Sequence, residues 1–394
     1  MLKCLFWLAA IAAIFSYFIY PVILRVNRLR TAHRLTLNPN ADQPSVSLIV
    51  TAYNEEARIE QKIHNTLAIQ YNRERLELIV ASDCSDDGTD EIVGHYADQG
   101  VRLVRASERL GKENAQRTAI AAATGEILVF SDVATEIPPD ALEKLVTYFS
   151  DPSVGAVSSE DRFISQDGSI AGEGAYVKYE MWLRKLESEQ AGLVGLSGSF
   201  FAARKTICQE WDIHSPSDFN TALNAAKAGL RAVSAPDVLG YYQDLKDPSK
   251  EYARKIRTVI RGMTGLWRHK EVLNVKTMGF FAFQVFSHKL MRWLTPWFLV
   301  ATFLLSALCA TAGAFYSLIF IGQLAFYGLA LAAHTAGSGG RTRRAVALLH
   351  LRPPADGRRP LSAAAGICHR YLRLSQSLCP SRAVLQPVLG LWLF

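Results

Sequence analysis

Short apolar runs alternate with helix-period stretches in the first half of the chain, and this alternation restricts the fold more than any other feature. The runs are Val46–Thr51, Leu76–Ala81, Val101–Arg105 and Ile127–Ser131. The stretches between them are Glu55–Ile69, Thr89–Asp98 and Glu113–Thr124. Short apolar strands alternating with helices are typical of βαβ units, which build a parallel sheet covered on both faces. The sequence therefore predicts an α/β domain with a mostly parallel sheet over residues 41–248.

Acidic side chains follow these runs at positions where a ligand site is expected. Asp83 comes just after the second run, and Asp132 comes just after the fourth. A further acid, Asp218, opens a later helix-period segment. The carboxyl ends of parallel strands meet at one edge of an open α/β sheet, and ligands bind there. We therefore expect these carboxylates to converge on one site.

A segment without charged side chains lies near the start of the chain. Leu5–Leu24 matches the roughly 20 apolar residues that a membrane-spanning helix needs. We predict an N-terminal anchor within residues 1–25. A cleaved signal peptide is the alternative, but the apolar core is long and no A-x-A-like site precedes Arg25. Because basic residues follow this segment and only Lys3 precedes it, the positive-inside bias places residues 25–290 in the cytoplasm.

A second uncharged segment lies between Arg292 and Arg341. It is long enough for two spans, which we place within residues 293–334 with a break near residues 310–313. Together with the anchor, these spans predict a multi-pass protein of the cell (inner) membrane whose α/β domain is cytoplasmic. Between that domain and the spans, residues 249–292 combine a basic helix with an amphipathic helix suited to the membrane interface.

The C-terminal residues 335–394 differ in composition from the rest of the chain. They are rich in Arg, Ala and Pro and show no clear periodicity. A reading-frame or truncation artefact is one interpretation, and a disordered basic tail is the other. The net charge of +7 comes without a basic stripe with interleaved aromatic residues, so we expect no nucleic-acid partner. The six cysteines have no C-x-x-C spacing, which argues against a cysteine metal cluster.

As an ordered set, the motifs of this chain resemble those of family 2 glycosyltransferases with the GT-A fold. The motifs are TAYNEE, ASDCSDDGT, FSDVAT, GLSGSFFAARK and SPSDFNTALNAAKAGLRAV. More narrowly, the stretch from Val46 to Phe320 is similar to the membrane-embedded polysaccharide synthases related to cellulose, chitin and hyaluronan synthases. The resemblance implies an inverting transferase that moves a sugar from a UDP-linked donor to a growing polysaccharide or oligosaccharide at the cytoplasmic membrane face.

The resemblance also implies partners, and it leaves alternatives open. The implied partners are a nucleotide-sugar donor, a polysaccharide or lipid-linked acceptor, membrane lipid and polysaccharide export subunits. One alternative is an enzyme that transfers a single sugar to a lipid phosphate carrier. The other is a catalytically degenerate partner subunit of a polysaccharide assembly complex, since Ala134, Thr258 and Gly262 stand where the family's chemistry has other residues.

Several residues match the family's donor-binding positions. The resemblance implies that Asp83 contacts the uracil or ribose, for which a carboxylate is a suitable acceptor. The alternative for Asp83 is a turn residue that caps the next helix. The resemblance places Asn54 and Glu55 beside the nucleotide's base. The alternative for Glu55 is a charge in the first turn of the helix. Lys112 matches a lysine near the pyrophosphate, and the alternative is a solvated lysine at a helix start.

The resemblance assigns a metal site and a catalytic base to two further acids. Asp132 occupies the first position of the D-x-D motif, which holds Mg²⁺ or Mn²⁺ at the diphosphate. The second position is Ala134, but these cations take few protein ligands when phosphates supply oxygens. Asp218 is expected to remove the proton from the acceptor hydroxyl. The alternative for Asp218 is a helix N-cap.

The remaining matches concern the leaving group and the acceptor. Arg261 matches the arginine of the family's Q-x-x-R-W motif and is expected to stabilise the leaving diphosphate, whereas Gly262 replaces the tryptophan. A membrane-surface arginine is the alternative. Gly195, Ser197 and Gly198 are expected to let the acceptor approach the backbone, or they simply form a tight turn.

Overall fold

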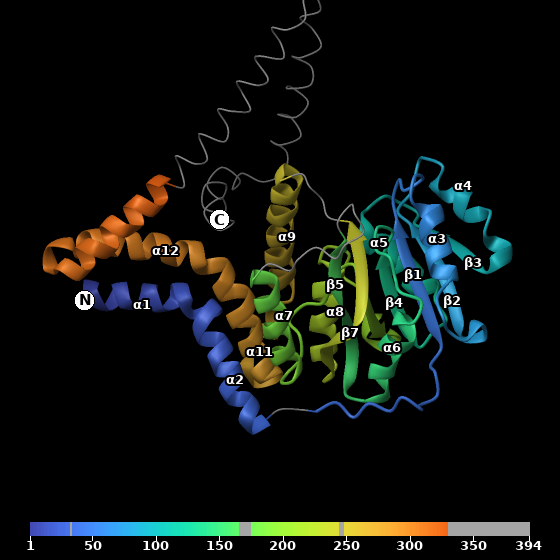
Figure 1. Ribbon diagram of the computed structural model, residues 1–394, viewed down its shortest axis with the longest axis horizontal. Helices are drawn as coiled ribbons and strands as arrows, with labels where there is room; N and C mark the ends of the chain where they lie inside the picture. The colour runs from blue at the N-terminus through green and yellow to red at the C-terminus, as the bar shows by residue number, and fades with distance from the viewer. Residues whose placement is uncertain (32–33, 165–174, 244–247, 330–394) are drawn as a thin grey trace, which may run out of the picture. The chain divides into compact units, whose positions relative to one another are not determined.

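The computed structural model describes residues 1–31, 34–164, 175–243 and 248–329 (Figure 1). The chain divides into two compact units, one formed by Ser16–Trp293 and the other by residues 1–15 together with those from 294 onward. The expected tail, residues 335–394, lies outside the described residues.

The larger unit is built around one seven-stranded sheet with the order β3-β2-β1-β4-β6-β5-β7. Strands β3, β2, β1 and β4 are parallel neighbours, β6 is antiparallel to β4 and β5, and β7 is parallel to β5. The strand bounds are β1 Val46–Ala52, β2 Leu76–Ser82, β3 Val101–Arg105, β4 Ile127–Asp132, β5 Val154–Ile164, β6 Phe200–Arg204 and β7 Arg231–Gln243. The predicted mostly parallel α/β sheet is confirmed.

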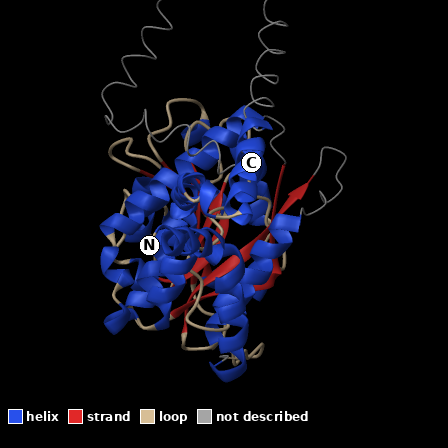
Figure 2. Cartoon of the chain, turned by 90° about the vertical axis from the view of Figure 1, so that its left-hand side faces the viewer, coloured by secondary structure: helices blue, strands red, loops and turns tan. Residues whose placement is uncertain are grey.

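Helices cover both faces of this sheet (Figures 1 and 2). Alternate residues of β1 point to opposite faces, so Leu48 packs with α3 and α6 while Ile49 packs with α5 and α8. Burial on both faces explains why the parallel strands read as continuous apolar runs. The helix bounds are α3 Ile59–Leu67, α4 Thr89–Gly94, α5 Lys112–Ala122, α6 Ala141–Thr147, α7 Ala175–Ser188, α8 Ser217–Lys227, α9 Pro248–Arg268, α10 Val275–Met278 and α11 Phe280–Val285.

Gly125 provides a test of this packing, because it lies where β4 enters the sheet beside β1. Its N–H donates to the Ser47 hydroxyl at 2.9 Å, and a Cβ added at Gly125 would lie 2.4 Å from the Ser47 backbone nitrogen. Neither backbone can move without disturbing the strand pairing. We expect Gly125→Ala to lower the free energy of unfolding by about 2–3 kcal/mol, measured by thermal unfolding of the detergent-purified protein.

Gly94→Ala is the matched control for this prediction. Gly94 ends α4, and a Cβ there would meet nothing within 4 Å. Since alanine is the better helix former by about 1 kcal/mol, this change leaves stability unaltered or slightly raises it. Equal destabilisation by both substitutions would contradict the packing at Gly125.

Two helices in the chain are long and apolar enough to cross a membrane, by length and composition. They are Leu2–Leu29 and Phe280–Leu308, and a shorter apolar helix covers Ala314–Leu329. The first comprises α1 Leu2–Ile14 and most of α2 Tyr20–Thr31, which are joined by the π-helical turn Phe15–Ile19. The expected break near residues 310–313 is present as a 3-10 turn over Ala310–Ala312.

The structure corrects one expected boundary. A separate interfacial helix was expected to end before residue 293, but α11 continues through a π turn into α12 Met291–Leu308 without a break. Arg292 was the charge that marked this boundary in the sequence. It is buried in the larger unit, where its guanidinium donates to Glu180 on α7 at 2.8 Å, so the charge does not end the helix.

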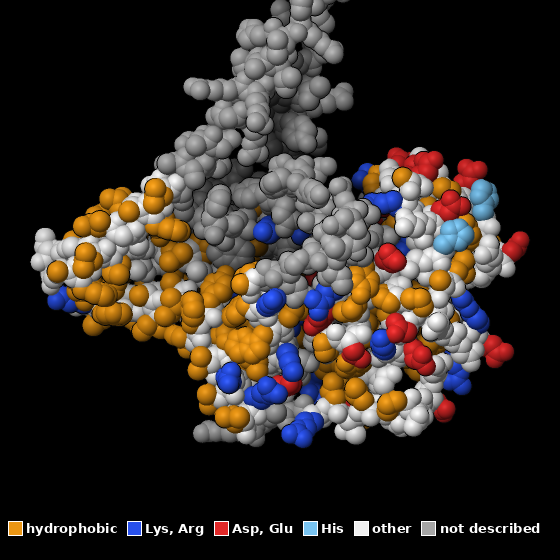
Figure 3. Space-filling model, in the orientation of Figure 1, with side chains coloured by type: hydrophobic (Ala, Val, Ile, Leu, Met, Phe, Trp, Pro, Cys, Tyr) orange, Lys and Arg blue, Asp and Glu red, His pale blue; other side chains and the backbone are white. Residues whose placement is uncertain are grey.

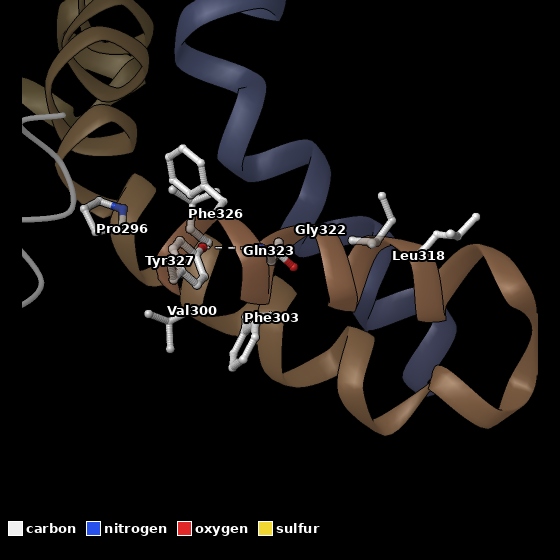
Figure 4. A pocket seen from close by; sticks show the side chains of 10 residues that line it. Pro296, Val300, Phe303, Leu318, Gly322, Gln323, Phe326 and Tyr327 are labelled. Carbon is white, nitrogen blue, oxygen red and sulfur yellow. Dashed lines mark hydrogen bonds between the residues drawn. The ribbon is translucent and has the colours of Figure 1, made fainter. Parts of the chain in front are cut away.

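The smaller unit presents apolar side chains over much of its surface (Figure 3). Phe6 of α1 packs edge-on against Tyr316 with ring centroids 5.1 Å apart. An apolar pocket lies between α12 and the helix Ala314–Leu329, with Phe303 and Phe326 among its lining residues (Figure 4). Inside this unit the Gln323 amide donates to the Tyr327 hydroxyl at 3.4 Å.

Candidate active site

The candidate site lies at the carboxyl ends of the central parallel strands. Asp132 is the last residue of β4 and pairs in register with Thr51 of β1, while Asp83 directly follows β2 on the other side of β1. The Asp83 N–H donates to the carbonyl of Ala52, the last residue of β1, at 3.0 Å. The sheet itself therefore brings these two acids to one edge, as the sequence predicted.

Asp83 is nearly buried, and its carboxylate binds backbone amides. The N–H groups of Leu110 and Gly111 donate to it at 3.0 to 3.3 Å. Gly111 precedes α5, so Asp83 fixes the loop that leads into Lys112. Asp83 therefore orders the loop before α5, whereas the alternative considered from the sequence was a cap on the helix that follows Asp83. A carboxylate has further lone pairs, so these bonds do not prevent it from accepting from a ligand.

Lys112 connects three parts of the site. It is the first residue of α5, and its ammonium binds the Asp132 carboxylate and donates to the Gly198 carbonyl at 2.9 Å. The Asp132 N–H donates to the Ser199 carbonyl at 3.0 Å. The lysine is therefore not simply solvated. It lies between the end of β4 and the glycine-rich loop, where both its side chain and that of Asp132 remain partly exposed.

Asp218 lies on the other side of that loop, in the first turn of α8. A Cβ added at Gly198 would be 3.7 Å from the Asp218 carboxyl carbon, and the Leu196 N–H donates to the Asp218 carbonyl at 3.3 Å. Pro216 is the N-cap residue and Asp218 lies in the first turn, so Asp218 does not occupy the N-cap position. The backbone N–H groups of Asp218 and Phe219 lie close enough to its carboxylate to oppose the rise of its pKa. The structure thus places Asp218 against Gly198, whose carbonyl binds Lys112.

Burial raises the pKa of Asp218 above the usual value for an aspartate, while the ammonium groups of Lys289 and Lys112 act in the opposite direction. Burial disfavours the charged form, and nearby cations favour it. A carboxylate with a raised pKa is a stronger base, which suits proton removal provided that the group is ionised at working pH.

Arg261 reaches the site from α9. Its guanidinium lies 2.7 Å from the carboxylate of Glu113, the buried neighbour of Lys112. At Gly262 an added Cβ would lie 2.9 Å from the Trp293 ring. A tryptophan side chain at position 262 has no room, because Trp293 already fills that space.

The first strand ends in a strained turn that is tied to the second. Asn54 has φ +53°, its side-chain Nδ2 donates to the Asp86 carboxylate at 2.6 Å, and its side-chain Oδ1 accepts from the Asp86 N–H at 3.1 Å. Cys84 also has positive φ, and such backbone is concentrated at functional sites. Glu55 instead pairs with Arg58 through two hydrogen bonds of 2.8 and 2.9 Å. It lies before α3, whose first-turn acid is Glu60, so the first-turn alternative for Glu55 is wrong.

The glycine-rich loop also holds groups that sequence reasoning missed. Ser197 and Ser199 both donate to the partly buried carboxylate of Asp161 on β5, and the Ser197 N–H donates to the Ser158 hydroxyl at 2.7 Å. Burial raises the pKa of Asp161. The Ser197 hydroxyl is thus bound to β5, and no local pattern marked Asp161, because β5 itself was not predicted.

Lys62 is a second missed residue, and it lies buried behind Asp132. Its ammonium donates to the Ser131 hydroxyl at 2.9 Å and to the Thr135 carbonyl, on either side of Asp132 in sequence. Burial lowers the pKa of Lys62 to about 7. The lysine shapes the turn that presents Asp132.

This lowered pKa predicts a pH dependence of stability. Between about pH 7 and pH 10 the unfolded chain holds a proton that the folded protein lacks, so the unfolding free energy rises by about 1.4 kcal/mol per pH unit. Below pH 7 Lys62 is charged in both the folded and the unfolded protein, so the free-energy cost of burying the charged ammonium no longer changes with pH. We expect Lys62→Met to remove this slope from the pH dependence of thermal unfolding. Parallel curves for the two proteins would contradict a buried lysine with this pKa.

Asp132 offers a metal ion only one carboxylate, so the bound substrate would have to supply further oxygen ligands. Lys112 binds one Asp132 oxygen, and the side chain is 41% exposed. Among the described residues there is no group of three or more His, Cys, Asp or Glu side chains that could hold a metal by itself. A hard cation bound through one carboxylate and diphosphate oxygens fits this arrangement.

Comparisons with known proteins bear on the larger unit. The family model for glycosyl transferase family 2 matches residues 47–211. The chain is 29% identical over 182 residues to the poly-beta-1,6-N-acetyl-D-glucosamine synthase of Staphylococcus aureus, covering 44% of this chain and 43% of that protein. It is 28% identical over 171 residues to the beta-monoglucosyldiacylglycerol synthase of Synechocystis sp., covering 42% of this chain and 36% of that protein. The matched part spans only about two fifths of these curated relatives.

A solved structure covers more of the chain. The mannosyltransferase PcManGT from Pyrobaculum calidifontis, in complex with GDP-Man and Mn²⁺, matches with a TM-score of 0.68 and 26% sequence identity. The match covers 84% of this chain and 92% of that chain.

Proposed function

We propose that the chain, whose residues 47–211 match the glycosyl transferase family 2 model, transfers a sugar from a nucleotide donor, with inversion, to an oligosaccharide or polysaccharide end. One observation carries this proposal. Lys112 binds both Asp132 and the Gly198 carbonyl, and Gly198 lies against Asp218. Lys112 therefore connects the edge where we place the diphosphate, at Asp132, to the loop that lies against the proposed base, Asp218.

The roles of the residues follow from their positions. The donor's diphosphate lies at Lys112 and Asp132, with Arg261 stabilising the charge that develops on the leaving group. Asp218, across Gly198, accepts the proton as the acceptor oxygen bonds to the anomeric carbon and the diphosphate departs from the opposite side. Displacement from the opposite face inverts the anomeric centre.

The nucleoside end of the donor falls at the ends of β1 and β2. Asp83 keeps lone pairs for a ribose or base donor beyond its bonds to the α5 loop. Asn54 orders the adjoining turn, and Tyr53 beside it presents a ring that already stacks on the Arg109 guanidinium at 3.9 Å. We propose that the nucleotide's base stacks on this cation–π pair. We propose a UDP-linked sugar as the donor.

A divalent cation, Mg²⁺ or Mn²⁺, belongs to this proposal. Asp132 would hold it together with the diphosphate, and the cation would neutralise charge on the leaving group. PcManGT was crystallised with GDP-Man and Mn²⁺, which supports a metal-assisted donor site of this fold.

The acceptor side lies at the glycine-rich loop, where Gly195, Ser197 and Gly198 face Lys289, Asp161 and Asp218 respectively. We propose a growing saccharide as the acceptor because the Staphylococcus aureus relative is named a polysaccharide synthase. The apolar helices Leu2–Leu29 and Phe280–Leu308 support placing the reaction at the cytoplasmic face of a membrane.

The rival is a single transfer to a lipid acceptor, which the name of the Synechocystis relative favours. A panel of labelled UDP- and GDP-sugars, incubated with membranes that contain the protein, tests the proposal and separates these products. Label in a polymeric product supports a synthase, and label in a solvent-extractable lipid supports the rival. If no donor transfers label above that of membranes without the protein, the proposed activity is wrong.

A further inference from the structure

Lys289 is a cation of the larger unit that the roles above do not use. It lies in the π turn Phe286–Leu290 of the helix that begins with α11, far in sequence from the site motifs. It is only partly exposed. Its ammonium lies 5.6 Å from the centroid of the Phe219 ring, and Phe219 is the residue after Asp218. The helix therefore delivers a positive charge to the start of α8.

The same ammonium touches the acceptor loop. A Cβ added at Gly195 would lie 3.2 Å from the Lys289 nitrogen, so any larger residue at position 195 would push this ammonium aside. The loop's Leu196 N–H is bonded to the Asp218 carbonyl. Lys289 and Asp218 thus lie at the two ends of one short loop.

The other cations near Asp218 are already committed. Lys112 of α5 binds Asp132 and the Gly198 carbonyl, and Arg261 of α9 binds Glu113. Within the part of the chain that the structure describes, Lys289 has no carboxylate or carbonyl in hydrogen-bond contact, and its ammonium lies over the Phe219 ring. Its charge interacts most strongly with Asp218 and also with Glu187 and Glu180 of α7, while Arg292 opposes it. Glu187 is already bound by Tyr20 and His288, and Glu180 by Arg292. Its charge remains available to the acid.

We propose that Lys289 is a positioning residue that keeps Asp218 ionised, so that the carboxylate can accept the acceptor's proton. This inference rests on the proposed function, in which Asp218 is the base. Burial alone pushes Asp218 toward its neutral form, which cannot remove a proton. The charge of Lys289 opposes this tendency, and the other acids that it interacts with, Glu187 and Glu180, are already paired with other groups.

The test is the pH dependence of kcat/KM for sugar transfer, from about pH 5 to pH 9, in the wild type and in Lys289→Met. We expect the acid limb of the profile to move up by about 1–2 pH units in the variant, because an opposite charge at close range is worth that much. The rate at high pH is retained, and nucleotide affinity is unchanged. Lys289→Arg keeps the charge and leaves the limb near its wild-type position.

Two further variants make the result specific. Lys276→Met removes an exposed lysine of α10 and leaves the profile unmoved. Gly195→Ala crowds the Lys289 ammonium without removing it, and we expect a smaller shift in the same direction, which keeps the test usable where Lys289→Met fails to bind nucleotide.

The outcomes separate this inference from the proposed function. An unmoved acid limb in Lys289→Met and Gly195→Ala, or an equal loss of rate at every pH, overturns the role of Lys289 while wild-type transfer stands. Absence of transfer by the wild type, or full activity of Asp218→Asn, overturns the proposed function itself.

Discussion

Asp218→Asn will reduce the rate of sugar transfer by about a hundredfold to ten-thousandfold, because a positioned general base contributes this much. The asparagine keeps the size of the side chain but cannot accept the proton. Since Asp218 lies across Gly198 from Lys112 and not at the diphosphate edge, the affinity for the nucleotide should change little. Initial rates with a labelled donor, together with nucleotide titration, measure the two effects separately.

The control for this variant is Asp140→Asn. Asp140 lies just before α6 and pairs with Lys144 one helical turn away, on an exposed surface. Surface pairs of this kind are worth less than about 1 kcal/mol, so the activity should remain near that of the wild type. If Asp218→Asn transfers sugar at a rate close to the wild type, Asp218 is not the base.

Asp132→Asn will abolish the metal dependence of nucleotide binding and lower the transfer rate by about a hundredfold or more, as expected when a charge-stabilising group at the leaving group is lost. Asp132 is the carboxylate that would hold the cation, and Ala134 offers no second ligand. In the wild type, Mn²⁺ and UDP should therefore strengthen each other's binding, while Mn²⁺ alone binds weakly. Calorimetric titration of UDP with Mn²⁺ and with EDTA reports this coupling.

The Lys112→Met variant separates the contribution of the lysine to UDP binding from that of the metal. Lys112 supplies a point charge that does not depend on the cation, so its loss should weaken UDP binding both with Mn²⁺ and with EDTA. Asp98→Asn, an exposed acid in a turn beyond α4, serves as the control and leaves both titrations unchanged. A wild type that binds UDP equally well with Mn²⁺ and with EDTA would contradict the metal site.

Much of the sheet was predictable because its parallel strands are buried on both faces. Continuous apolar runs located β1 to β4 within about one residue of their observed ends. The same rule missed β5, which carries charged residues at Glu160, Asp161 and Arg162, and β7, which contains Pro236. Those charges are satisfied by tertiary contacts, such as the bonds from Ser197 and Ser199 to Asp161, that no local pattern contains.

In the candidate site, too, some residues could be placed from the sequence and others depend on tertiary packing. Asp83 and Asp132 could be placed together because strand order alone puts them at one edge of the sheet. The contacts of Lys112 with Asp132 and Gly198 depend on how α5 and the glycine-rich loop pack, over sequence separations of 20 and 86 residues. The sequence predicted only that Lys289 lies in an amphipathic helix. The hydrophobic periodicity of that helix does not indicate that it packs against α8.

The most direct test of the account is an experimental structure of the Asp218→Asn protein with its UDP-sugar and Mn²⁺, since this variant should bind the donor without turning it over. We expect the diphosphate between Lys112 and the metal at Asp132, the nucleoside at Asp83, and the sugar's far face open toward position 218. A nucleotide bound elsewhere, or a sugar whose reacting carbon faces away from position 218, would contradict it.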